Sequence, residues 1–166
     1  MDPWDSPQLR VHARILVDSF HRWTGRHLLD KDVAGISDAE LAARVFHAPR
    51  VFVSHGTQAD PILNYGNQTA LTLWEMDWNS FTATPSRLTA EAPEREERAR
   101  LMATVTRDGF IANYAGIRIS KSGRRFRISQ AIVWNLVDAE GHPAGQAATF
   151  DRWEPIESST KRIALG

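Results

Sequence analysis

The sequence predicts an α+β fold, in which helices pack on one face of a five-stranded antiparallel sheet and a helical extension precedes them. Apolar residues recur every three or four positions in 6–25, as in an amphipathic helix. After Gly109 the apolar period changes to two, and turn sequences at 121–123 and 138–141 separate three extended segments. A chain of 166 residues with 42% hydrophobic residues can bury one core, so we expect one domain with terminal extensions.

The extension, 1–49, contains two predicted helices. Ser6 caps the first, Pro7 occupies its first turn, and Gly25 ends it. Its apolar stripe must lie on the outside of the sheet or pair with a second copy of the chain. We favour a homodimer, with an interface formed by Leu9, Leu16, Phe20 and Trp23. A capping box from Ser37 to Glu40 opens the second helix, 38–46.

Two short strands and several helices are predicted next. Segments 51–56 and 61–67 are rich in strand-forming residues and form a hairpin. Asn67 caps a helix over 68–76, and Asp77 starts a further turn. A longer helix, 93–108, ends at Gly109, and its mixed charges at 94–98 predict a solvated, ion-paired face.

Three strands, 110–119, 124–137 and 145–153, complete the sheet. In the middle strand every second residue is apolar, which places one set of side chains on the packed face. Gln130 is the amide within this set, and a buried amide needs a hydrogen-bond partner. The set comprises Phe126, Ile128, Ile132, Trp134 and Leu136. Residues 156–166 form a polar tail.

Composition excludes several classes of function. Twenty basic and twenty acidic residues give zero net charge, which argues against a nucleic-acid partner, although Lys121, Arg124, Arg125 and Arg127 form a local basic cluster. No apolar stretch is long enough to span a membrane and the N-terminus is acidic, so we expect no membrane partner and a cytoplasmic location. The absence of cysteine excludes thiolate metal sites, thiol nucleophiles and cysteine-linked chromophores.

The sequence carries no established catalytic or metal-binding motif. Ser54, His55 and Asp60 have the residue types of a catalytic triad, but adjacent strand residues point to opposite faces, so Ser54 and His55 are not expected to bond. The six histidines lack metal-site spacing. We therefore predict no metal and no resident cofactor, and no catalytic residue is assigned.

Several sequence strings resemble known sensor domains. The junction at 62–71, the segment 116–126 and the connection at 138–145 resemble PAS domains. A closer resemblance is to the MEKHLA domain, a PAS-like module that also ends plant class III homeodomain-leucine-zipper proteins. It is carried by SHGT (54–57), DPILNYGN (60–67), PSRL (85–88), REERAR (95–100), GFIANY (109–114) and VWNL (133–136). The literal string that names the family, a homeodomain and a heptad zipper are all absent.

The resemblance implies a PAS-like domain over 50–155 with a sensory or association role. In PAS-like folds a ligand lies between the sheet and the central helices, and the residues that would reach this space here are Tyr65, Trp74, Phe81, Tyr114, Gln130, Trp134 and Gln146. Arg87 and Arg118 are candidates for holding an anionic ligand. Two alternatives stay open: an interaction module with a filled core, and an enzyme that uses the same cavity with a titrating pair such as His55 and Asp60.

Overall fold

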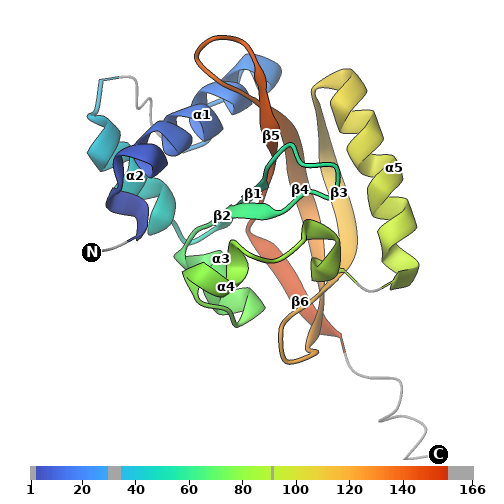
Figure 1. The fold of residues 1–166 in the computed structure, drawn as a ribbon. Helices are drawn as coiled ribbons and strands as arrows, with labels where there is room; N and C mark the ends of the chain where they lie inside the picture. Colours follow the sequence, from blue (N-terminus) through green and yellow to red (C-terminus); the bar gives the residue numbers. More distant parts are fainter. Residues whose placement is uncertain (1–2, 30–34, 91, 157–166) are drawn as a thin grey trace, which may run out of the picture.

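The computed structural model describes residues 3–29, 35–90 and 92–156. In these residues, an antiparallel sheet of six strands carries helices on both of its faces (Figure 1). The main strand order is β2-β1-β5-β4-β3, and β6 pairs with β4. The strands are β1 (Val51–His55), β2 (Leu63–Gly66), β3 (Phe110–Ile119), β4 (Arg125–Val137), β5 (Pro143–Phe150) and β6 (Arg152–Ile156).

The α+β class is confirmed, and the number of strands is corrected. The last predicted strand, 145–153, is interrupted at Asp151, so that β5 pairs with the second half of β4 and β6 with its first half. The hairpin of β1 and β2 forms as predicted. Most of the predicted polar tail, 157–166, lies outside the described residues.

One face of the sheet, here called the outer face, is covered by α1 (Pro7–Thr24) and α2 (Asp38–Phe46), which follow a short turn, η1 (Pro3–Asp5). The caps of α1 are those predicted: Ser6 Oγ accepts from Leu9 N at 3.2 Å, and Gly25 has a φ of 70° that favours glycine. None of the helices in the described residues has the length and apolar character needed to cross a membrane.

The apolar stripe of α1 is buried within its own chain. Leu16 and Phe20 are completely buried against the outer face, where the Trp134 indole N–H donates to Leu16 O at 3.3 Å. Leu9 and Trp23 are partly buried at the same core, and Trp23 Nε1 donates to Asn135 O at 3.0 Å. Of the two expected positions for this stripe, the structure has the one on the outside of the chain's own sheet, and a homodimer stays a prediction.

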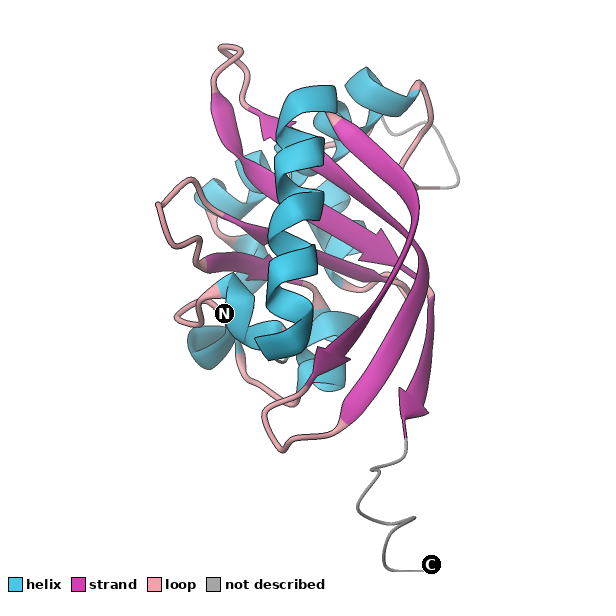
Figure 2. Cartoon of the chain, turned by 90° about the vertical axis from the view of Figure 1, so that its right-hand side faces the viewer, coloured by secondary structure: helices cyan, strands magenta, loops and turns pink. Residues whose placement is uncertain are grey.

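The opposite face, here called the inner face, is covered by four helical segments. These are α3 (Gln68–Trp74), α4 (Trp78–Phe81), η2 (Ser86–Thr89) and α5 (Ala92–Asp108). Figure 2 shows α5 lying in front of the sheet. Asn67 and Asp77 cap α3 and α4 as predicted. The helix after Asn67 ends at Trp74, earlier than expected, because Glu75 adopts a left-handed conformation with a φ of 60°.

A bulge in β4 exchanges its two faces. Gln130 has a φ of 53°, and the alternation of side chains shifts by one residue at this point. Phe126 and Ile128 consequently face inward, whereas Ile132, Trp134 and Leu136 belong to the core under α1. Gln130 itself is exposed. The prediction that Gln130 and all five apolar residues share one face is therefore wrong, because it assumed an unbroken period of two.

Glu75 joins α3 to the turn between β3 and β4. Its carboxylate accepts from Ser120 Oγ at 2.6 Å and from Arg124 Nη1 at 3.1 Å. The hydrogen bonds from Ser120 and Ser122 lower the pKa of Glu75 to about 2. Because the folded-state pKa lies below that of the unfolded chain, the stabilisation is present above pH 4.5 and is lost as the pH falls toward 2.

We expect Glu75→Gln to lower the free energy of unfolding at pH 7. The neutral amide of glutamine lacks the negative charge that strengthens the hydrogen bonds from Ser120 and Arg124. The difference between the two proteins should shrink as the pH falls from 4.5 to 2. Urea unfolding of both proteins across this range measures it. A constant difference at every pH would show that the carboxylate charge is irrelevant to the contact.

Candidate ligand-binding site

A cavity of about 60 Å³ lies between the inner face and the helices that cover it. It forms because β1, β4 and β5 direct alternate side chains inward while α3, α4 and α5 close over them. Most of its wall is apolar. This part of the wall is made by Val53, Leu63, Trp74, Phe81, Leu101, Met102, Ile128, Ala131, Val133, Ala148 and Phe150.

Arg118, from β3, is the most deeply buried cation of the wall, with 6% of its surface exposed. Its Nη2 donates to Tyr114 Oη at 2.9 Å and its Nη1 to Ile117 O at 2.8 Å. The guanidinium also lies 5.5 Å from the centre of the Tyr114 ring. Gly116 makes room for this pair, since a Cβ there would lie 2.7 Å from Tyr114 Oη and 3.0 Å from Arg118 Nη1.

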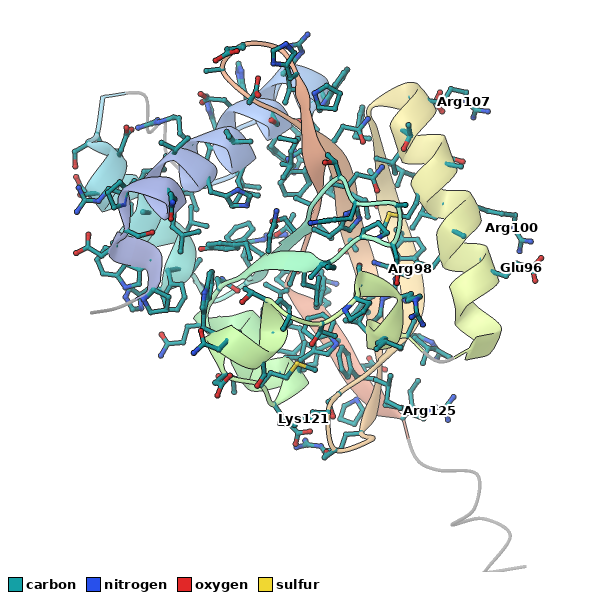
Figure 3. All side chains as sticks on the ribbon, viewed as in Figure 1. Glu96, Arg98, Arg100, Arg107, Lys121 and Arg125 are labelled. Atoms are coloured by element: carbon teal, nitrogen blue, oxygen red, sulfur yellow. The ribbon has the colours of Figure 1, made fainter. Side chains whose placement is uncertain are left out.

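Arg98 brings a second guanidinium to the same cavity from α5. Figure 3 shows it pointing inward from the helix, whereas Glu96, Arg100 and Arg107 point outward. It donates to Ser86 Oγ. Burial, and secondarily the nearby charge of Arg118, lower the pKa of Arg98 to about 10, so it stays charged at neutral pH. No carboxylate among the described side chains forms an ion pair with Arg98 or Arg118.

His55, from β1, lies where the cavity approaches the surface. Its Nδ1 lies 2.9 Å from Gly56 O, which assigns the ring proton to Nδ1, and its Nε2 lies 3.4 Å from Met102 Sδ. Burial lowers the pKa of His55, and the charge of Arg98 adds to this effect against the opposing hydrogen bond to Gly56. The imidazole is therefore neutral at pH 7.

The predicted separation of Ser54 from His55 is confirmed. Ser54 Oγ donates to Asn64 Oδ1 at 2.5 Å and lies 2.9 Å from His12 Nε2, on the α1 side of the sheet. His55 faces the cavity instead. Asp60 pairs with Arg87 at 3.2 Å, so neither Ser54 nor Asp60 reaches the imidazole.

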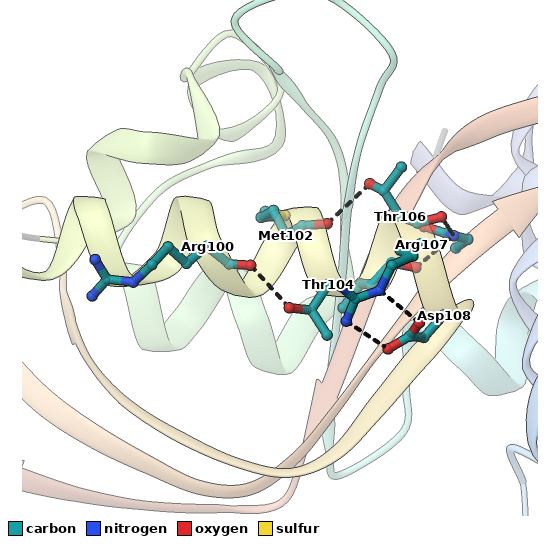
Figure 4. A network of polar contacts seen from close by, with 8 residues as sticks. Arg100, Met102, Thr104, Thr106, Arg107 and Asp108 are labelled. Carbon is teal, nitrogen blue, oxygen red and sulfur yellow. Dashed lines mark hydrogen bonds and ion pairs between the residues drawn. The ribbon is translucent and has the colours of Figure 1, made fainter.

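A groove of about 760 Å³ on the surface shares part of its wall with the cavity. The shared residues are His55, Ser86, Arg98, Met102 and Gln146. Gln146 Nε2 donates to Met102 O at 3.2 Å and to Thr106 Oγ1 at 3.0 Å, which ties β5 to α5. Thr106 Oγ1 in turn donates to Met102 O (Figure 4). The side chains of His55 and Met102 therefore belong to the part of the wall that the cavity shares with the groove.

The structure brings together five of the nine predicted site residues. Trp74, Phe81, Tyr114, Arg118 and Gln146 all line the cavity, and ligand binding by them stays a prediction. Tyr65 and Trp134 belong to the core of the outer face, and Gln130 is exposed. Arg87 lies in the wall of the surface groove and pairs with Asp60.

The positions of Tyr65 and Arg87 have local causes. The pairing of β2 with β1 is irregular beside Asn64, and this irregularity turns Leu63 toward the cavity and Tyr65 toward His12. Arg87 is the second residue of η2, which begins after Pro85, and its side chain is half exposed and paired with Asp60 at the surface.

Arg98 was not among the predicted site residues, because the mixed charges at 94–98 predict a solvated helix face. Its position was readable in principle, since Arg98, Leu101, Met102 and Val105 follow helical spacing and mark the side of α5 that faces the sheet. The charged residues on both sides of Arg98, at 94–97 and 100, make this helical spacing difficult to recognise in the sequence. In the described residues, no three His, Asp or Glu side chains lie close enough together to hold a metal ion.

Comparison with known proteins agrees with this architecture. The sequence model of the MEKHLA domain matches residues 10–155. Homeobox-leucine zipper protein ATHB-14 of Arabidopsis thaliana is 24% identical over 149 residues, which are 89% of this chain and 18% of that protein. The chain therefore spans less than a fifth of the length of the curated relatives that it matches.

Solved structures with the same fold are PAS and light-oxygen-voltage domains. The PAS domain of a protein from Colwellia psychrerythraea superposes with a TM-score of 0.58 at 13% identity, covering 70% of this chain and 94% of that one. A light-oxygen-voltage domain gives a TM-score of 0.54 at 16% identity, covering 76% of this chain and 91% of the other. These similarities confirm the PAS-like fold. Because the family match extends from α1 to β6, this chain belongs to the MEKHLA domain family.

Proposed function

We propose that this chain is a sensory or regulatory module that binds a small molecule in the cavity of its inner face. The observation that supports this most directly is the pair of guanidinium groups, Arg98 and Arg118, beside a mostly apolar space. Protein cores are densely packed, and the cavities that stay empty in them are apolar. Polar groups converging on an apolar pocket are typical of ligand sites.

The size of the cavity restricts the ligand. A water-sized group needs about 10–15 Å³ of such volume, so the cavity has room for roughly four to six non-hydrogen atoms. Sites for cofactor-sized ligands usually measure about 300–1,000 Å³. The ligand is accordingly a small metabolite, and the site as described has no room for a flavin or a haem.

Binding in this cavity has a direct route to the surface. Arg98, Leu101 and Met102 contribute one wall from α5, and the opposite side of that helix is exposed. A ligand that changed the position of Arg98 would therefore change the surface that α5 presents to a partner. This arrangement suits a module that converts ligand binding into an altered association.

Nuclear magnetic resonance of the ¹⁵N-labelled chain tests the proposal. A panel of neutral, anionic and cationic molecules of up to about six non-hydrogen atoms is titrated, and at least one class should shift the signals of cavity residues in a saturable way. Ala148→Leu should abolish these shifts, because Ala148 lines the cavity. The control Ala139→Leu adds the same atoms in an exposed turn and should leave binding unchanged. Absence of saturable binding, or binding that survives Ala148→Leu, contradicts the proposal.

A further inference from the structure

We propose that the ligand of this cavity is a short-chain monocarboxylate, held by Arg118 and Arg98 at its charged end and by apolar side chains at the other. The inference rests on the proposed function and names the ligand class. Leu63, Phe81 and Ile128 supply apolar surface, while Tyr114 and Ser86 position the two guanidinium groups.

The charge balance of the cavity favours an anionic ligand. An arginine side chain stays protonated in a protein, and a buried charge is strongly unfavourable unless an opposite charge compensates it. Arg118 is almost completely buried, and Arg98 lies close enough for the two positive charges to repel each other. The described side chains provide no carboxylate for either arginine, and the counter-charge that we propose is an anionic ligand.

The hydrogen-bond donors in the cavity favour a planar carboxylate. A guanidinium has five N–H donors, and Arg118 uses one on Tyr114 and one on Ile117 O. The remaining donors of both arginines suit a planar carboxylate, which arginine binds through two parallel hydrogen bonds. The indole N–H of Trp74, also in the wall, has no acceptor among the described residues.

The apolar part of the wall favours a carboxylate over an inorganic anion. Phosphate and sulfate present oxygen atoms in every direction and need donors all round, whereas most of this wall is apolar. A monocarboxylate with a short alkyl group matches both parts of the wall. The volume of about 60 Å³ fits acids of roughly the size of propionate and butyrate.

The test compares propionate with propanamide, which has the same number of non-hydrogen atoms and no charge. Both are titrated into the ¹⁵N-labelled full chain at constant ionic strength, and the signals of Arg98, Arg118 and the Trp74 indole are followed. We expect saturable binding of propionate, with propanamide weaker by about tenfold or more. Phosphate and sulfate, titrated in parallel, should not saturate these signals.

Matched variants assign the binding to the arginines. Arg118→Gln and Arg98→Gln should each weaken propionate binding by about tenfold to a hundredfold. Arg100→Gln removes a charge from the same helix at an exposed position and should change binding by less than about twofold. Gly116→Ala is a second variant for the case in which an arginine variant does not fold. Its Cβ would displace the Arg118 guanidinium, so it should weaken propionate binding without removing a charge.

The outcomes separate this inference from the proposed function. If propanamide binds as tightly as propionate, or if both arginine variants bind propionate normally, the cavity takes ligands but the monocarboxylate assignment is wrong. If phosphate or sulfate saturates the same signals as tightly as propionate, the ligand class is likewise wrong. If no compound of the panel binds, both the inference and the proposed function fail.

Discussion

The double substitution Leu16→Glu and Phe20→Glu is expected to prevent the chain from folding. Both side chains are completely buried between α1 and the outer face of the sheet. Each contributes about 1.5–3 kcal/mol through burial of apolar surface, and each new carboxylate adds a desolvation penalty of several kcal/mol. The sum approaches the roughly 5–15 kcal/mol that stabilises a typical domain. Circular dichroism and light scattering of the purified variant measure the outcome.

Val11→Glu is the matched control for this variant. Val11 lies on the same helix and is 57% exposed, so a carboxylate there stays in water and should leave the melting temperature nearly unchanged. If the double variant were instead a folded monomer and the unmodified chain a dimer, α1 would cover a second copy in solution. That result would support the homodimer that the sequence favours and contradict the packing described here.

The caps and turns show how much of this fold the sequence predicts. Ser6, Ser37, Asn67 and Asp77 each begin a helix as expected, because a capping side chain bonds to backbone only two or three residues away. The positions of most strand segments also follow from the sequence, since a period of two is local, but the break at Asp151 and the bulge at Gln130 do not. The sequence does not determine which surface each helix or strand packs against. The apolar stripe of α1 is an example, since it could have packed on the sheet or on a second copy of the chain.

The candidate site was harder to predict because two small irregularities reassign its residues. The bulge at Gln130 and the irregular pairing beside Asn64 turn Trp134 and Tyr65 to the outer face. Neither position is a glycine, so nothing in the residue types signals the change of face. Arg98 was missed for the opposite reason, since its charge suggests solvent while the helical spacing of its neighbours directs it inward.

Replacing Asn67 with alanine is expected to destabilise the fold far more than removal of a helix cap alone. The Asn67 side chain is completely buried and makes four hydrogen bonds. Its Oδ1 accepts from Ala70 N and Phe52 N, both at 3.1 Å, which caps α3 and anchors β1. Its Nδ2 donates to Arg50 O at 2.8 Å and to Val45 O at 3.1 Å, and these two bonds connect Asn67 to the C-terminal end of α2 and to the residue before β1.

Asn67→Ala leaves four buried backbone groups without these partners, at about 1 kcal/mol or more each, so we expect a loss of roughly 4 kcal/mol in urea unfolding. Ser37→Ala is the control, because Ser37 caps α2 at an exposed end through the single bond to Glu40 N and should lose about 1 kcal/mol.

Asn67→Asp separates the two sets of bonds. It keeps the acceptor for α3 and β1 but places a carboxylate oxygen against the Arg50 and Val45 carbonyl groups, so it should destabilise the chain at neutral pH. If Asn67→Ala lost no more free energy of unfolding than Ser37→Ala, Asn67 would act as an ordinary helix cap, and its hydrogen bonds to β1 and α2 would contribute nothing.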